Sequence, residues 1–129
     1  MTDLAAALLE KAARAIATAE RLLPTGEIEV VVSRAYYAML YVAQALLARR
    51  GQRFRKHAGV HSAFGEHFAK PGLLDAKYHR WLLAAFEKRL TADYGVEEAL
   101  EVDDARTLIQ HAREFLDAAR RYLAEHQSA

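Results

Sequence analysis

Residues 27–50, EIEVVVSRAYYAMLYVAQALLARR, decide the fold of this chain. Apolar side chains recur along them every three or four positions, which is the spacing of one face of an α-helix. Three consecutive valines at 30–32 favour a strand locally, but the helical period of the residues that follow outweighs them. The stretch therefore predicts a buried central helix. The residues of its apolar stripe are Ile28, Val32, Ala35, Met39, Ala43 and Leu46.

Four more helical segments flank this one in the sequence. They are residues 2–23, 57–70, 75–91 and 102–125, each with apolar residues at helical spacing. Residues 92–94, just before Gly95, are predicted to be the exit of the segment 75–91. Short connections between long amphipathic helices favour antiparallel neighbours. We therefore expect an all-α protein, an up-and-down antiparallel bundle of four to five helices, with residues 1–129 as a single domain.

The composition excludes several classes of function. The chain has no cysteine, which rules out disulfides, thiolate nucleophiles and cysteine-ligated zinc, and favours a reducing cytoplasm. Eighteen Lys and Arg oppose seventeen Asp and Glu, so any attraction to nucleic acid must come from a local patch. The chain has neither a phosphate-cradling glycine loop nor a nucleophilic serine elbow. We expect no cofactor.

The sequence favours neither a membrane span nor a metal site. The most apolar run, residues 35–48, is shorter than the ~20 residues that cross a bilayer. The chain begins Met-Thr-Asp and places Lys11 and Arg14 within its first apolar stretch, unlike a signal peptide. His57 and His61 have metal-compatible spacing, but the Glu-x-x-His pairs of di-iron bundles are absent. We therefore expect no membrane association and no metal.

A second stripe on the central helix mixes polar and aromatic residues. Two interpretations of Tyr37 and Tyr41 remain open: they lie at the margin of the core, or they line a dimer interface or ligand groove. Arg34 needs a partner because a charge is costly to bury alone, and Asp93 is the first candidate. The residues of this stripe are Val30, Arg34, Tyr37, Tyr41, Gln44 and Ala48.

The strongest candidate for phosphate binding is the basic segment that follows this helix. It places five cations in eight residues and is followed by His57. The alternative is a solvated loop whose charges balance the acidic residues between 97 and 104. The five cations are Arg49, Arg50, Arg53, Arg55 and Lys56.

Three motifs together resemble the HEPN-domain family. They are SRAYYAM at 33–39, KHAGV at 56–60 and RLTADY at 89–94, and the similarity covers roughly residues 27–100. The order and spacing are those of the short stand-alone prokaryotic branch. The resemblance implies a helical bundle, often a homodimer, associated with RNA cleavage or nucleotide binding. It also implies a small nucleotidyltransferase as a partner, in a toxin–antitoxin pair.

The sequence departs from the family pattern at the ribonuclease motif. Active family members carry an arginine, then four to six intervening residues, then a histidine, and Arg89 occupies the arginine position. Tyr94, Gly95 and Val96 stand where the histidine belongs.

Three hypotheses follow from this departure. The first is a binding module for RNA, nucleotide or a nucleotidyltransferase, using Arg34, Tyr37, Arg89, Asp93 and Tyr94, with the basic segment guiding the approach. The second is a metal-independent ribonuclease in which Arg89 stabilises the phosphate and Asp93, His57 or His61 replaces the usual base. The third is a structural or protein-interaction bundle in which Arg34, Arg89 and Asp93 form a buried polar network.

Overall fold

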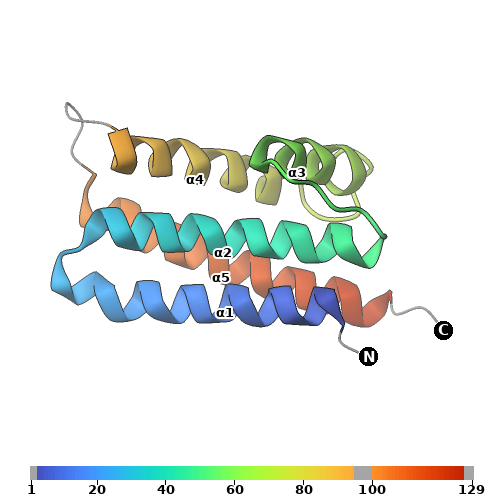
Figure 1. The fold of residues 1–129 in the computed structure, drawn as a ribbon, viewed down its shortest axis with the longest axis horizontal. Coiled ribbons are helices and arrows are strands. Elements are labelled where there is room, and N and C mark those ends of the chain that lie inside the picture. Colours follow the sequence, from blue (N-terminus) through green and yellow to red (C-terminus); the bar gives the residue numbers. More distant parts are fainter. Residues whose placement is uncertain (1–2, 95–99, 127–129) are drawn as a thin grey trace.

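The computed structural model describes residues 3–94 and 100–126, and within them the chain is a bundle of α-helices. Four long helices run alternately up and down, with α3 packed beside α4 at one end (Figure 1). The expected all-α antiparallel bundle is therefore confirmed. The elements are α1 (Leu4–Leu22), a short turn η1 (Leu23–Thr25), α2 (Ile28–Arg49), α3 (His57–Phe64), a π-helical turn η2 (Gly65–Ala69), α4 (Lys77–Tyr94) and α5 (Val102–Glu125).

The central helix is α2. Figure 1 shows it between α1 and the α3–α4 pair, with α5 behind it. Val32, Ala35 and Met39 of its apolar stripe are fully buried, as predicted. Its length and composition would also suit a membrane span, but 67% of its most apolar window is buried inside the bundle. In this structure α2 is the core helix.

Alanines set how closely α1 approaches α2. Ala5, Ala12, Ala15 and Ala19 are all buried on one face of α1. Small side chains at such a contact let two helix backbones lie close together, so the seam between α1 and α2 is tight. The long side chains of both helices are left to stand at the edges of this seam.

Two helix boundaries differ from those predicted. Residues 92–94 belong to α4, because neither a proline nor a glycine interrupts the helix before Gly95. The third helix changes from α to π geometry after Phe64. At that point Gly65 packs against the ring of His79, and a Cβ on Gly65 would lie 2.6 Å from a ring carbon. A larger residue at position 65 would therefore require the His79 ring to move.

Candidate functional site

The mixed stripe of α2 lies on the side of the helix that its neighbours cover least. Arg34, Tyr37 and Tyr41 are half-buried, whereas the apolar stripe is sealed. The rings of Tyr37 and Tyr41 are 6.0 Å apart between centroids, so they form a short aromatic strip along the helix. The tyrosines thus lie at the core margin and line the outer face together.

Two guanidinium groups flank the ring of Tyr37. The Cζ atom of Arg34 lies 5.1 Å from the ring centroid, and Cζ of Arg89, from α4, lies 5.2 Å from it. Both distances are within the range of cation–π attraction. This pairing brings together three of the residues singled out in the sequence, from helices that are more than fifty positions apart in the chain.

Asp93 pairs with Arg89 and not with Arg34, so the predicted Arg34–Asp93 pair is wrong. Oδ2 of Asp93 is 3.4 Å from Nη2 of Arg89, which is four residues earlier on the same helix. Side chains at this spacing meet on one helix face, whereas Arg34 stands on α2 and has the Tyr37 ring as its partner. Nε of Arg89 is buried and has no hydrogen-bond partner within residues 3–94 and 100–126.

Beneath Tyr37, a tyrosine and two histidines form a hydrogen-bonded cluster. The hydroxyl of the fully buried Tyr36 lies 2.8 Å from Nε2 of His61 and 3.2 Å from Nδ1 of His57. Since the hydroxyl has one proton, it donates to one ring nitrogen and accepts from the other. The four-residue spacing of the histidines on α3 serves this contact. No group of three His, Cys, Asp or Glu side chains that could hold a metal occurs in the part of the chain that the structure describes.

Burial sets the protonation of this cluster. Burial, together with smaller contributions from the nearby His57 and His79, lowers the pKa of His61 to about 4. Partial burial and the Arg89 charge lower the pKa of His57, and burial raises the pKa of Tyr36. At pH 7 both histidines are therefore neutral and Tyr36 is protonated. His57 is half-exposed, and in the tautomer whose Nδ1–H donates to the Tyr36 hydroxyl its Nε2 is able to accept a proton from a ligand.

The basic segment is divided between structural and free cations. Arg49 pairs with Asp3, and Arg50 donates to the carbonyl of His67 while lying over the ring of Phe68. Arg53, Arg55 and Lys56 are exposed and have no ion pair with any described carboxylate. These last three remain available to an anionic ligand.

The expected balance between the basic segment and the acidic residues before α5 is not found. Asp103 pairs with Arg106, Asp104 pairs with Lys88, and Glu101 forms the capping box of α5. These carboxylates stabilise the N-terminus of α5, where their negative charge interacts favourably with the helix dipole. Glu97 and Glu98 lie outside the described residues.

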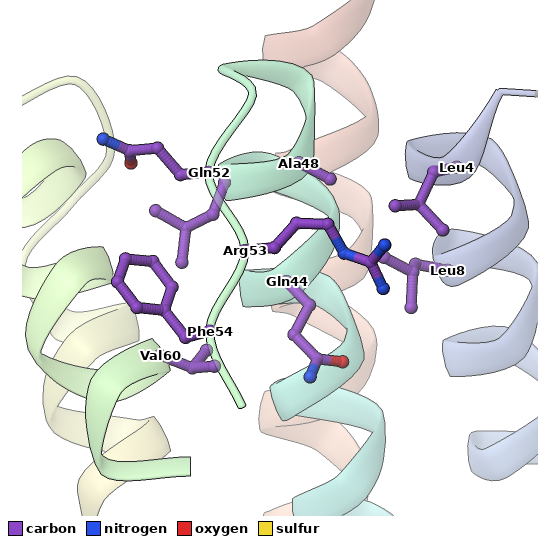
Figure 2. Close-up of a pocket in the computed structure, with 9 residues that line it drawn as sticks. Leu4, Leu8, Gln44, Ala48, Gln52, Arg53, Phe54 and Val60 are labelled. Atoms are coloured by element: carbon purple, nitrogen blue, oxygen red, sulfur yellow. The ribbon is translucent and has the colours of Figure 1, made fainter. Parts of the chain in front are cut away.

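Arg53 lines a pocket between α1, the end of α2 and the segment that follows it. The pocket holds about 400 Å³ of free space, counted to its open mouth. Figure 2 shows Arg53 reaching from this segment toward Leu8 of α1, with Gln44 below it. Tyr94 is far more open, with 79% of its surface exposed at the end of α4. The pocket is lined by Leu4, Leu8, Gln44, Leu47, Ala48, Gln52, Arg53, Phe54 and Val60.

Sequence reasoning did not predict the contacts that Tyr36, His61 and Lys11 make in the structure. Tyr36 lies in the RAYYAM motif, but its neighbour Tyr37 drew attention because it belongs to the mixed stripe. His61 was considered as a metal ligand and as a substitute base, but not as a hydrogen-bond partner of Tyr36. Lys11 lies with its Nζ 4.7 Å from the centroid of the Tyr41 ring, a contact between α1 and α2 that no local pattern indicates.

The geometry defines a class of protein: a small antiparallel helical bundle whose outer face carries cations and aromatic rings. Residues 5–122 match the HEPN domain family, and the chain belongs to this family. A UPF0332 protein of Gloeobacter violaceus is 34% identical over 119 residues, 92% of this chain and 94% of that protein. A Methanocaldococcus jannaschii protein named "Putative toxin" is 32% identical over 116 residues, 90% of this chain and 79% of that protein. The resemblance drawn from the three motifs is thereby confirmed.

Proposed function

We propose that the protein is a toxin-like HEPN protein that binds single-stranded RNA at the surface formed by Arg34, Tyr37 and Arg89, which we call the Tyr37 face. The observation that carries this proposal is the half-buried Tyr37 ring, which has the guanidinium groups of Arg34 and Arg89 within 5.1 and 5.2 Å of its centroid. An aromatic ring offers a stacking platform to any base, and guanidinium groups bind phosphate. Arg34 and Arg89 thus supply the charge, and Tyr37 supplies the stacking surface. The name "Putative toxin" of two relatives from Methanocaldococcus jannaschii supports the toxin-like part of the proposal.

The unpartnered Nε of Arg89 supports the same site. Buried polar groups normally have a hydrogen-bond partner, and a group left without one costs about 1–3 kcal/mol. Nη2 of Arg89 is occupied by Asp93, while Nε has no partner among the described residues. Nε is closed to solvent in this structure, so a phosphate oxygen would reach it after an outward rotation of the Arg89 side chain, and would then compete with Asp93 for the remaining donors.

RNA titration monitored by fluorescence anisotropy tests this function. We expect a labelled 12-nucleotide RNA to bind in chelator, and Tyr37→Ala to weaken binding about 10-fold, since a stacked base contributes ~1–3 kcal/mol. Tyr37→Phe, which keeps the ring, is the matched control and should bind almost as well as the wild type. Equal affinity of the alanine and phenylalanine variants would exclude stacking on Tyr37, and no binding by the wild type would exclude the function.

RNA cleavage is the second candidate function, and the position of His57 favours it. Of the three candidate bases, Asp93 is paired with Arg89 and His61 is sealed in the core. His57 is neutral, half-exposed and close enough to Arg89 for that charge to lower its pKa. Its Nε2 would take the proton of a 2′-hydroxyl as that oxygen attacks the adjacent phosphorus, and the departing 5′-oxygen would take a proton from water.

The same RNA assay, analysed on a gel, separates cleavage from binding. If His57 is the base, His57→Ala abolishes the 2′,3′-cyclic phosphate product while RNA affinity stays within about threefold of the wild type. Cleavage that persists in folded His57→Ala would rule out this base.

We also propose that the protein is a homodimer formed through α4. Leu83, Leu90 and Tyr94 are exposed apolar side chains that share one face of α4. Light scattering is expected to give twice the 14.5 kDa mass of the chain, and a value of one chain mass at micromolar concentration would contradict the proposal.

A further inference from the structure

An open groove of about 430 Å³ runs along the seam between α1 and α2. Ala15 is buried at the seam, and longer side chains stand on both sides of it. Arg34 and Tyr41 come from α2, and Arg34 also belongs to the Tyr37 face. The lining residues are Lys11, Arg14, Ala15, Thr18, Arg34 and Tyr41.

The charge of this groove is uncompensated. Lys11, Arg14 and Arg34 line it, and the lining contains no carboxylate. None of the three has an ion pair with a carboxylate in residues 3–94 or 100–126, whereas Arg49 and Arg113, which also contact α1, are paired with Asp3 and Glu20. An anionic ligand would therefore find the cations of the groove free.

One aromatic ring, Tyr41, lines the groove beside these cations, and a second, Tyr37, lies next to Arg34 at its end. Nζ of Lys11 lies 4.7 Å from the centroid of the Tyr41 ring, and Arg34 lies over Tyr37. Alternating cations and exposed aromatic rings are typical of surfaces that follow single-stranded nucleic acid, because phosphates and bases alternate along the strand.

The groove continues in both directions. At one end it joins the Tyr37 face through Arg34, and at the other, Leu8 and Gln44 stand one helical turn beyond Lys11 and Tyr41. Leu8 and Gln44 line the pocket at which Arg53 points (Figure 2). From Leu8 to Thr18 the groove is about 15 Å long, at 1.5 Å per residue of α1.

We infer that this groove is the path of the RNA strand beyond the Tyr37 face, with Lys11 and Arg14 as phosphate ligands and Tyr41 as a second stacking surface. The inference rests on the proposed function and extends it, because it names the substrate class as an extended single strand. A mononucleotide or dinucleotide would occupy the Tyr37 face alone. The path ends at Arg53, and this residue of the basic segment would bind a phosphate there.

The test compares RNA lengths in one double variant. Lys11→Gln with Arg14→Gln is expected to weaken binding of a 15-nucleotide RNA about 10-fold. It should reduce the slope of log affinity against log salt by about 1.4, since each phosphate contact on a single strand contributes about 0.7. Binding of a dinucleotide should be unchanged. Arg80→Gln with Arg120→Gln removes two exposed cations from α4 and α5 and is the matched control; it should leave both affinities unchanged.

The outcomes distinguish this inference from the proposed function. If the long RNA loses no affinity in the Lys11 and Arg14 variant while Tyr37→Ala still weakens the dinucleotide, the groove is not the path and the Tyr37 site stands. If the control variant loses as much as the groove variant, binding is diffuse attraction and the inference is overturned. If no RNA of any length binds the wild type, the proposed function itself fails.

Discussion

Replacing Arg89 by alanine is expected to weaken RNA binding by about 10- to 100-fold and to leave the fold intact. A charge-assisted hydrogen bond contributes ~1.5–3 kcal/mol, which corresponds to this range of affinity. The Arg89–Asp93 pair is a partly exposed i,i+4 pair, and such pairs contribute only ~0.3–0.5 kcal/mol to stability. Anisotropy titrations together with urea unfolding of the same variant measure both quantities.

Asp93 gives this prediction its sharpest control. Asp93→Asn removes the competing carboxylate, so RNA affinity should rise two- to threefold, while Arg80→Ala on the same helix should change nothing. A structural role for the Arg89–Asp93 pair predicts the opposite pattern. In that case Arg89→Ala and Asp93→Asn would destabilise the fold by similar amounts, and RNA affinity would follow stability alone.

Acid is expected to destabilise the protein through His61. Its pKa is about 4 in the folded state, against about 6.5 in the unfolded chain. Below pH 6.5, His61 is therefore protonated in the unfolded chain but stays neutral in the folded protein. The free energy of unfolding consequently falls as the pH decreases toward 4. Between pH 7 and pH 4.5 the loss from this group is about 2–3 kcal/mol. His57, whose pKa is also lowered, adds to the loss.

Urea unfolding at the two pH values measures this effect. His61→Gln keeps a group able to hydrogen-bond the Tyr36 hydroxyl but does not titrate, so more than half of the pH-dependent loss should disappear in this variant. The carboxylates are the same in both proteins, so their contributions cancel in the comparison. If the wild type and the variant lose stability in parallel, His61 is not buried in its neutral form.

Local patterns predicted the helices, and they also explain one contact of the site. The period of apolar residues within α2 is a property of neighbouring positions, and so is the i,i+4 spacing of Arg89 and Asp93, which form the salt bridge that this spacing favours. The end of α4 was placed too early because Asp93 and Tyr94 precede a glycine. The helix nevertheless continues to Tyr94, since nothing before Gly95 prevents it.

The rest of the site depends on contacts between distant segments. Tyr36 meets His57 and His61 at separations of 21 and 25 residues, and Lys11 meets Tyr41 across two helices. Such contacts are set by the rotation and closeness of packed helices, which the alanine face of α1 determines. A single sequence specifies that a helix is amphipathic but does not specify which residue of its neighbour each side chain will contact.

Photocrosslinking tests the central claim, RNA binding at the Tyr37 face, most directly. A single-stranded RNA containing 4-thiouridine would be irradiated on the wild-type protein, and the adducts located by trypsin digestion and mass spectrometry. The account predicts adducts on the peptide that contains residues 35–49, at Tyr37 and Tyr41. Adducts confined to α5, or RNA binding with no adduct on α2, would contradict it.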